Sequence, residues 1–406
     1  MIKVCKVLYY HQAFDDRIFY KEALSLKSFG YEVTILVPTF DSKFNKGNEI
    51  IQLDNNNEAI VDGIRIKGIS CKEYKFPIVG IILNIISFSR ALWKTIKTTE
   101  ADIYHCHDHK ICLHAFLYVL KKLKKQKSKA KFVWDAHEYY HGMIIDLYKY
   151  KLSYLFFKPW MSFLDRQIMK YIDFVITADE ATQFYYCVLN PYVNTSVLLN
   201  VPSKKIFSFN PGEIRKNGTF TLIHEGIMAF NRGLVEMVEL MKKIKKENLP
   251  IKLKILGKIP SKERNYLDSQ IIDQQLQDYI FIAGTVPYEQ VGKEIQSCHV
   301  GLVTLHPTLN CISAMANKFF NYMLYGLPVI ASNFPEMARV IRESDCGVTF
   351  ITENSSDLFQ KVFELYSNKE YYNRLSANAF ALANRKNNWE EEEKILQKIY
   401  SQLVAN

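Results

Sequence analysis

The sequence lacks several motifs that would assign it at once to a common enzyme class. It contains no G-x-S-x-G nucleophile elbow and no Walker A lysine, which argues against an ordinary serine hydrolase or P-loop enzyme. No G-x-G-x-x-G follows the first strand-like run, residues 2–9, which argues against a dinucleotide-dependent oxidoreductase. The eight cysteines never stand in C-x-x-C spacing, so neither a zinc ribbon nor a redox pair is indicated.

Long apolar runs are also missing. The longest such stretch, residues 76–89, is shorter than the ~20 residues that a helix needs to span a bilayer. The N-terminus enters a strand-like run without the pattern of a signal peptide, and scattered cysteines are typical of a reducing compartment. We therefore predict a cytoplasmic protein, with the inner face of the cell membrane as the alternative location.

The length and charge of the chain set the next limits. Its 406 residues are too many for one ordinary core and suit two α/β domains. The net charge is +10, and residues 1–200 hold most of the excess, with 27 basic against 20 acidic side chains. Such an excess attracts a phosphorylated substrate, anionic lipid or nucleic acid, or forms a solvated lysine-rich surface.

A repeating strand–helix pattern organises the chain. Apolar strand-like runs alternate with amphipathic helical segments through the first half, which predicts a parallel sheet. A polar stretch that contains Pro211, Gly212 and Gly218 reads as a linker, after which the alternation restarts. The end of the chain reads as one amphipathic helix. The predicted parts are an N-terminal domain at 1–203, a C-terminal domain at 204–385 and a final helix at 386–406.

Two segments of the second half carry candidate phosphate-binding residues. In HEGIMAFNRGL (224–234), Gly226 follows a strand and Arg232 stands at the start of the next helix, where backbone N–H groups and a guanidinium suit an anion. In NKFFNYMLYGLPVIAS (317–332), Lys318 stands at the start of a helix and suits the phosphates of a nucleotide. An ordinary helix–turn–strand unit of a parallel sheet is the alternative for each segment.

Three loops of the first half place polar side chains after predicted strands. Side chains at the C-terminal ends of parallel strands face the ligand-binding edge of the sheet. His107 beside Asp108, and His137 beside Glu138, suit acid–base work or the orientation of hydroxyl groups. Metal binding is a rival interpretation, although adjacent loop residues are a poor ligand frame, and simple hydrogen-bonded loop ends are another. The three loops are HQAFDDR (11–17), HCHDH (105–109) and DAHEYY (135–140).

Taken in order, these segments resemble the retaining GT-B glycosyltransferases of family 4, over nearly the whole chain. DDRIFYKEALSLKSFGYEVTIL is similar to the family's opening strand, loop and helix, and HCHDH and VWDAHEYY are similar to its histidine loops. HEGIMAFNRGL resembles its phosphate loop, NKFFNYMLYGLPVIAS its donor helix and NNWEEEEKILQKIY its C-terminal helix. The resemblance implies two Rossmann-like, doubly wound parallel-sheet domains that face a central cleft.

The resemblance also implies what the parts do. The second domain would bind a nucleoside-diphosphate sugar as co-substrate, and the first a lipid-linked or saccharide acceptor, in capsule, O-antigen or exopolysaccharide synthesis. Catalysis would rest on electrostatic stabilisation of the leaving diphosphate, without a metal or another cofactor. The residues so assigned are His137, Arg232 and Lys318 as catalytic; Gly226, Arg232, Gly257, Ser313, Asn317, Lys318 and Asn321 for the donor; and Asp16, Arg17, His107, Asp108 and Glu138 on the acceptor side.

A lysine-rich aromatic run, residues 148–163, adds a prediction about partners. Together with the basic first domain, it suggests peripheral contact with an anionic membrane that carries the acceptor. An ordinary helix with core aromatics is the alternative. Nucleic acid is not among the expected partners.

Some positions depart from the family pattern. Ser313 and Asn321 stand where the family commonly has two glutamates, and Ile227 where an arginine often follows the loop glycine. An amide in place of the second glutamate binds ribose hydroxyls more weakly because it lacks the charge. Two other functions therefore stay open: a non-catalytic GT-B partner subunit, and a sugar-nucleotide epimerase of the same fold.

Overall fold

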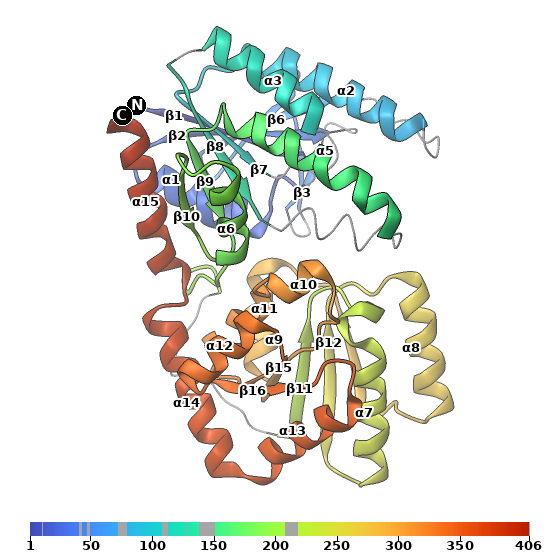
Figure 1. Ribbon diagram of the computed structural model, residues 1–406. Coiled ribbons are helices and arrows are strands. Elements are labelled where there is room, and N and C mark those ends of the chain that lie inside the picture. Colours follow the sequence, from blue (N-terminus) through green and yellow to red (C-terminus); the bar gives the residue numbers. More distant parts are fainter. Residues whose placement is uncertain are drawn as a thin grey trace. The chain divides into compact units, whose positions relative to one another are not determined.

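The computed structural model describes residues 1–9, 11–39, 43–46, 49–71, 79–107, 113–127, 129–137, 151–207 and 218–405. The chain divides into two compact units, drawn in Figure 1. The first unit comprises Met1–Leu199 with Glu393–Asn406, and the second comprises Asn200–Glu392. The limits expected from the sequence lie after residues 203 and 385.

The first unit is built on an eight-stranded sheet. Its inner strands are largely buried, as parallel strands covered by helices generally are. All pairings are parallel except that of β5 with β6, which is antiparallel and forms a hairpin. In spatial order the strands are β10 (Asn194–Val197), β9 (Phe174–Thr177), β8 (Lys131–Ala136), β7 (Ile103–His107), β1 (Lys3–Val7), β2 (Glu32–Thr39), β6 (Ile64–Ser70) and β5 (Glu58–Val61).

Helices connect these strands, and a separate two-stranded antiparallel sheet follows β2. Helices α2 and α3 pack on each other, and α3 also packs on α5. None of the helices in the described ranges combines the length and the apolarity needed to cross a bilayer. The helical elements are the π-helix η1 (Asp16–Ala23), α1 (Leu24–Ser28), α2 (Val79–Ile96), α3 (Leu113–Gln126), α5 (Lys151–Met169) and α6 (Glu180–Leu189); the small sheet pairs β3 (Lys43–Lys46) with β4 (Glu49–Gln52).

The second unit repeats the plan with a six-stranded sheet that is parallel throughout. In spatial order its strands are β13 (Ile280–Gly284), β12 (Ile251–Leu256), β11 (Phe220–Glu225), β14 (Val300–Val303), β15 (Val329–Ser332) and β16 (Gly347–Phe350). Its helices are η3 (Phe230–Arg232, a 3₁₀ turn), α7 (Leu234–Lys246), α8 (Ser261–Asp273), α9 (Tyr288–Gln296), α10 (Leu309–Ser313), α11 (Asn317–Leu324), α12 (Pro335–Ser344), α13 (Ser355–Ser367) and α14 (Lys369–Arg385).

Each large sheet reverses its winding direction once. In the first unit the chain proceeds from β1 to β2 and β6 and then returns to the other side of β1 with β7. In the second it proceeds from β11 to β12 and β13 and returns beside β11 with β14. Two doubly wound α/β units of this kind are the fold class predicted from the sequence. Ligands of such sheets bind outside the carboxyl ends of the strands at the reversal point.

The last helix belongs to both units. Helix α15 (Trp389–Ala405) begins in the second unit, where the Trp389 N–H donates to the Pro202 carbonyl at 2.8 Å. From Glu393 onward its residues are part of the first unit, and its apolar stripe there, Leu396, Ile399 and Tyr400, is buried. The predicted amphipathic helix is therefore present.

Candidate functional site

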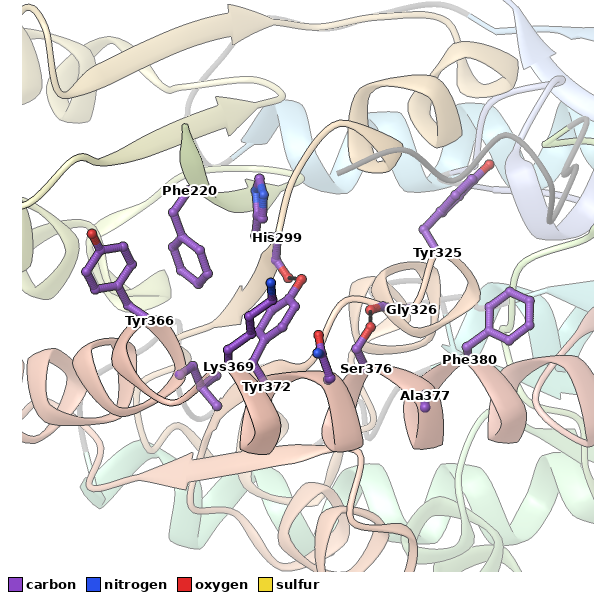
Figure 2. A pocket seen from close by; sticks show the side chains of 12 residues that line it. Phe220, His299, Tyr325, Gly326, Tyr366, Lys369, Tyr372, Ser376, Ala377 and Phe380 are labelled. Carbon is purple, nitrogen blue, oxygen red and sulfur yellow. Dashed lines mark hydrogen bonds between the residues drawn. The ribbon is translucent and has the colours of Figure 1, made fainter. Parts of the chain in front are cut away.

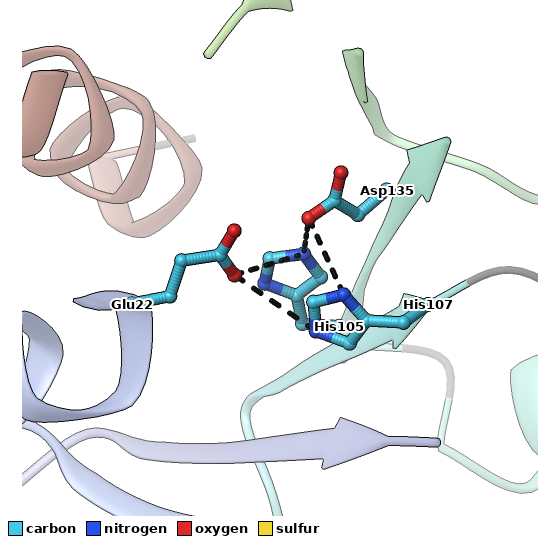
Figure 3. A group of neighbouring side chains, drawn as sticks. All are labelled: Glu22, His105, His107 and Asp135. Carbon is cyan, nitrogen blue, oxygen red and sulfur yellow. Dashed lines mark ion pairs between the residues drawn. The ribbon is translucent and has the colours of Figure 1, made fainter. Parts of the chain in front are cut away.

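Three neighbouring strands of the first unit bring ionisable side chains together at the reversal point. In the sheet register, Lys6 of β1 lies beside His105 of β7, and His107 of β7 lies beside Asp135 of β8. His105 and His107 are two residues apart, so both side chains project from the same face of the sheet. With Glu22 of η1, the two histidines and Asp135 form the group shown in Figure 3, and the Lys6 side chain contacts this group. All of these side chains are fully buried.

The Lys6 ammonium is the centre of this group. Its Nζ lies 2.5 Å from Glu22 Oε2, 3.1 Å from His107 Nε2 and 3.3 Å from His105 Nδ1. Burial lowers the pKa of Lys6, and Glu22 opposes that shift. Because an ammonium only donates hydrogen bonds, both ring nitrogens that face it accept. Burial and then Lys6 lower the pKa of His105 and, further, that of His107, so both imidazoles are neutral.

Arg17 provides the second buried cation. Its Nε donates to Glu22 Oε1 at 2.8 Å, one terminal nitrogen donates to Asp135 Oδ1 at 3.1 Å, and the other to the Leu198 carbonyl at 2.8 Å. Burial opposes ionisation of Asp135, yet Arg17 and the neighbouring histidines hold the pKa of its carboxyl well below the usual range. Arg17, assigned to the acceptor side from the sequence, therefore has its guanidinium bonded inside the first unit.

His137 stands at the edge of the same network. Its Nε2 lies 3.1 Å from His107 Nδ1 and 3.3 Å from Asp135 Oδ2. Since His107 accepts from Lys6 at Nε2, its proton is on Nδ1 and is donated toward His137 or Asp135. The His137 side chain is 12% exposed, whereas those of His107 and Asp135 are 0% exposed. His137 is thus the outermost histidine of the chain of contacts.

A loop after β1 adds a further imidazole–carboxylate pair beside His137. His11 Nδ1 lies 3.0 Å from Asp15 Oδ2, and the rings of His11 and His137 are 4.7 Å apart. Asp15 also caps η1, because its Oδ1 accepts from the backbone N–H of Arg17 and Ile18. Burial opposes the ionisation of Asp15, but the opposing effects are stronger and lower its pKa to about 2. The hydrogen bond from His11 is the largest of these lowering effects.

The acceptor-side residues predicted from the sequence are only partly brought together. His107 and Arg17 belong to the network just described. Asp16 is half-buried and pairs with Lys21 at 3.3 Å, on the helix that Asp15 caps. Asp108 and Glu138 lie outside the described residues.

Two features of the first unit bear on metal binding. Glu22, His105, His107 and Asp135 offer ligand atoms within 4.8 Å of one another, but the Lys6 ammonium already contacts the atoms of three of them. Residues 137–141 also read H-E-x-x-H, a spacing that presents two zinc ligands only on a helix. Within the described part of that segment, His137 directly follows strand β8. The side chains of Figure 3 therefore hold the Lys6 ammonium of the same chain.

In the second unit, the carboxyl ends of β11 and β12 are lined by glycine. Gly226 has φ +98° and Gly257 has φ +135°, both in the region that favours glycine. The two turns touch: a Cβ on Gly257 would lie 2.2 Å from the Gly226 carbonyl oxygen. Both glycines are therefore required by the backbone itself, and neither adds a side chain at the ends of these strands.

Lys318 brings a buried cation to this edge from the first turn of α11. Its Nζ lies 3.2 Å from His224 Nε2 and faces Gly226, from whose ideal Cβ position it is 3.7 Å away. Burial and then Arg232 lower the pKa of Lys318 to about 7. Burial and then Lys318 hold the pKa of His224 well below its ordinary value, so His224 is a neutral acceptor. The ammonium thus has no carboxylate partner among the described residues.

Arg232 ends the 3₁₀ turn η3 and is half-buried. Gly233 follows with φ +82°, and a Cβ there would collide with Thr304, whose hydroxyl donates to the Arg232 carbonyl at 2.9 Å. This contact fixes the backbone that carries the guanidinium. Within the described ranges, the Arg232 guanidinium makes no ion pair or side-chain hydrogen bond. Arg232 and Lys318 therefore form a site of positive charge at the reversal point.

Glu225, the last residue of β11, is a residue that sequence reasoning missed. Asn321 of α11 is buried, and its side-chain amide donates to Glu225 Oε1 at 3.1 Å and to Oε2 at 3.0 Å. The backbone N–H of Glu225 donates to the Tyr322 hydroxyl at 2.8 Å. The only signal in the sequence was a carboxylate immediately before the glycine at a strand end.

The other donor residues predicted from the sequence lie on α10 and at the start of α11. Ser313 ends α10, and its hydroxyl donates to the Leu309 carbonyl at 3.3 Å. Asn317 is exposed as the first residue of α11. The structure thus gathers Gly226, Gly257, Lys318 and Asn321 around one strand edge, with Ser313 and Asn317 on the segment that leads into α11.

A separate pocket lies on the opposite edge of the same sheet (Figure 2). Phe220 begins β11 and His299 precedes β14, so the pocket is at the amino ends of these strands. Its aromatic rings pack on one another, and the Tyr372 hydroxyl donates to the His299 carbonyl at 3.1 Å. Because ligands of doubly wound sheets bind at the carboxyl ends, the glycine-lined edge is the better candidate site.

Two family models match the chain, one in each half. Residues 17–191 match the model described as Glycosyltransferase Family 4, and residues 209–381 match the model described as Glycosyl transferases group 1. Between them the two matches account for most of the chain. No curated protein matches the sequence.

Solved structures that resemble the whole chain have low sequence identity. Sucrose-phosphate synthase from Thermosynechococcus elongatus has a TM-score of 0.70 at 13% identity and covers 100% of both chains. HepE of Anabaena, in complex with UDP and glucose, has a TM-score of 0.69 at 12% identity and covers 99% of this chain and 100% of its own. The catalytic domain of starch synthase IV from Arabidopsis thaliana, bound to ADP and acarbose, has a TM-score of 0.66 at 12% identity and covers 100% of each chain.

The structural likeness supports the fold, and the two family models supply the class. A family 4 domain comes first and a group 1 domain second, each on a doubly wound sheet that is parallel apart from the β5–β6 hairpin. The chain is a glycosyltransferase of the GT-B type.

Proposed function

We propose that this protein transfers a sugar from a nucleoside-diphosphate sugar to a lipid-linked or saccharide acceptor, with retention of anomeric configuration. The observation that carries the proposal is the pair of cations, Arg232 and Lys318, at the glycine-lined carboxyl ends of β11 and β12. Cations without carboxylate partners suit the diphosphate of such a donor. The UDP and ADP named for the HepE and starch synthase structures support this choice of donor.

The chemistry asked of the second unit is stabilisation of the departing diphosphate. As the bond to the sugar breaks, negative charge grows on the leaving oxygen, and Lys318 and Arg232 are placed to attract it. Preorganised charge of this kind is often the largest single contribution to catalysis. We propose that these side chains suffice for it without a metal ion or another cofactor.

The first unit is proposed to serve the sugar and the acceptor. The Nε2 of His137 lies against His107 and Asp135, and these contacts orient the ring so that its other edge would meet a hydroxyl group. By the family resemblance this is the histidine that contacts the transferred sugar. The wider role that we propose is capsule, O-antigen or exopolysaccharide synthesis, in the cytoplasm at the inner face of the membrane.

Calorimetric titration with a panel of nucleotide sugars, followed by product analysis, tests the proposal. We expect one donor to bind and to be transferred, or slowly hydrolysed, with the product keeping the anomeric configuration of the donor. Activity that persists in EDTA is expected for a metal-independent enzyme. Failure to bind any donor would instead favour the non-catalytic partner subunit, and conversion of the donor sugar without an acceptor would favour the epimerase.

A further inference from the structure

His224 is an ionisable side chain buried in an otherwise apolar part of strand β11. It follows Leu222 and Ile223, and all three side chains are fully buried. Burial and then Lys318 hold the pKa of the imidazole well below its ordinary value, so the ring is neutral. A leucine here would be buried without the cost of taking a polar ring out of water. Packing alone therefore does not account for a histidine at this position.

The two ring nitrogens of His224 have different surroundings. Nε2 lies 3.2 Å from Lys318 Nζ and 3.4 Å from the Ile227 carbonyl oxygen. Within the described part of the chain, the buried Nδ1 has no hydrogen-bond partner. An ammonium only donates, so Nε2 accepts from Lys318 and the ring proton lies on the unpartnered Nδ1. The other tautomer leaves the Nδ1 lone pair without a donor. The imidazole is therefore retained at a cost to folding, as groups that serve a site often are.

The charge of Lys318 depends on the groups that surround it. Burial and then Arg232 of η3 disfavour the ammonium, whereas Glu225 of β11 and Cys311 of α10 favour it. His224 adds a hydrogen-bond acceptor at contact distance. A neutral acceptor stabilises an ammonium without cancelling its charge, as a paired carboxylate would. The contact with His224 therefore leaves Lys318 positive toward an anion.

We infer that His224 is a positioning residue for Lys318, which it holds in the charged form beside the Gly226 turn. The Lys318 Nζ lies 3.7 Å from the ideal Cβ position of Gly226. Because His224 is fully buried, it acts through Lys318 and not by contact with the donor. This role rests on the proposed function, since it takes the diphosphate as the anion that Lys318 attracts.

The pH dependence of pyrophosphate binding, measured by calorimetry on the full-length protein, tests this role. His224→Leu removes the acceptor at similar volume, so the pH at which affinity falls should move down by about one unit. Affinity for inorganic pyrophosphate should then be about tenfold below wild type at pH 8, but within about twofold of it at pH 5.5. The ionisation of pyrophosphate is the same for both proteins and cancels in this ratio. His224→Gln, whose carbonyl can replace Nε2 as acceptor, should recover most of the loss.

Stability separates positioning from a purely structural role. At pH 8 the Lys318 side chain of the free protein is mostly neutral, since its pKa is about 7. His224→Leu also removes the unpartnered Nδ1, so it should unfold at the same temperature as wild type or a higher one. The matched control is His299→Leu, because the buried His299 Nδ1 accepts from the Thr221 N–H at 3.1 Å. That variant should unfold at a lower temperature and keep the wild-type pH dependence of binding.

The outcomes distinguish this role from the proposed function. A His224→Leu variant whose affinity relative to wild type is the same at both pH values would overturn the role of His224. A loss of stability like that of His299→Leu would do the same. In both cases, binding of a nucleoside diphosphate by wild type would leave the proposed function standing. A wild type that binds neither pyrophosphate nor any nucleoside diphosphate would overturn both.

Discussion

The two units treat buried charge in opposite ways. In the first, Lys6 and Arg17 each contact carboxylates, and the same two carboxylates, Glu22 and Asp135, surround neutral histidines. In the second, the Lys318 ammonium contacts a neutral imidazole, and within the described ranges Arg232 forms no ion pair. A network compensated from within holds side chains in place, whereas positive charge left without partners is available to an anion. The buried charges of the first unit therefore orient side chains, whereas those of the second are available to stabilise a bound anion.

The largest expected effect is on stability, from Lys6→Met in the first unit. Removing the ammonium leaves Glu22 with one cation instead of two in a buried site, and breaking such a pair costs about 3–5 kcal/mol. Chemical denaturation monitored on the whole chain measures the loss. Lys242→Met, which breaks a partly exposed pair with Glu239 on α7, should cost at most about 1 kcal/mol. Equal effects of the two variants would contradict an internally compensated network.

The second prediction concerns turnover, from Arg232→Ala in the second unit. Loss of one group that stabilises developing charge typically lowers kcat by about 10²–10³-fold. Thermal unfolding should change little, because within the described ranges the guanidinium has no partner to lose. Arg264→Ala on α8, which loses only a partly exposed pair with Asp268, is the control and should keep wild-type turnover. An Arg232→Ala variant as active as wild type would remove the contrast between the units.

The third prediction is a pH dependence of donor binding that arises from Lys318. Its pKa in the free protein is about 7, and a bound diphosphate favours the charged ammonium and so raises that pKa. Affinity should therefore be highest below pH 7 and fall as pH rises, by roughly 20-fold between pH 6.5 and 8.5 if the bound pKa exceeds about 9. Calorimetry in buffers of different ionisation enthalpy should record proton uptake on binding. Lys318→Arg should flatten the pH profile; an unchanged profile would exclude Lys318 as the group that titrates.

The same shift has the opposite sign for folding. The unfolded chain carries Lys318 with an ordinary pKa near 10.5, so between pH 7 and 10.5 the unfolded state binds more protons than the native state. The contribution of Lys318 to the free energy of unfolding therefore increases with pH across that window. As pH rises, the contribution of Lys318 to stability should therefore increase while donor affinity falls. We expect this opposition in the second unit, where the lysine has no carboxylate partner among the described residues.

The smallest expected effect concerns the membrane contact proposed for the first unit. Trp160 and Phe163 of α5 are about half exposed and stack at 5.9 Å. Replacing both with alanine should weaken co-sedimentation with anionic liposomes by roughly fivefold, equal to about 1 kcal/mol of buried apolar area. Phe184→Ala on α6, an exposed ring elsewhere in the first unit, is the control. A wild type that does not sediment with anionic liposomes at low salt would remove the membrane proposal.

Local patterns in the sequence were enough to predict the fold. Alternating apolar runs identified the strands, and Gly326, with φ +61°, stands just beyond α11 as a helix stop should. The first helical segment, Asp16–Ser28, is less regular. It begins as the π-helix η1, capped by Asp15, and becomes α-helical only at Leu24, because the path of the backbone there depends on the cap and on the buried bonds of Arg17.

Site residues could be predicted only where a single segment of the sequence showed the pattern that points to them. Lys318 and Gly226 could be proposed from their own loops. The contact of Asn321 with Glu225 joins residues 96 positions apart, and the bond of Arg17 to the Leu198 carbonyl joins residues 181 positions apart. Such contacts depend on strand order and register, which apolar periodicity does not encode. Asn321 considered alone therefore suggested that a carboxylate is missing. The carboxylate that it contacts, Glu225, lies on strand β11.

The path of α15 determines the order in which the two units are completed during synthesis. Tyr400 of this helix is fully buried in the first unit and donates its hydroxyl to His105 Nδ1 at 2.7 Å. The residues that complete the first unit, Glu393–Asn406, leave the ribosome after every residue of the second. The first unit is thus completed by residues that are synthesised after the second unit, so until Glu393–Asn406 emerge the nascent chain carries a first unit that lacks these residues.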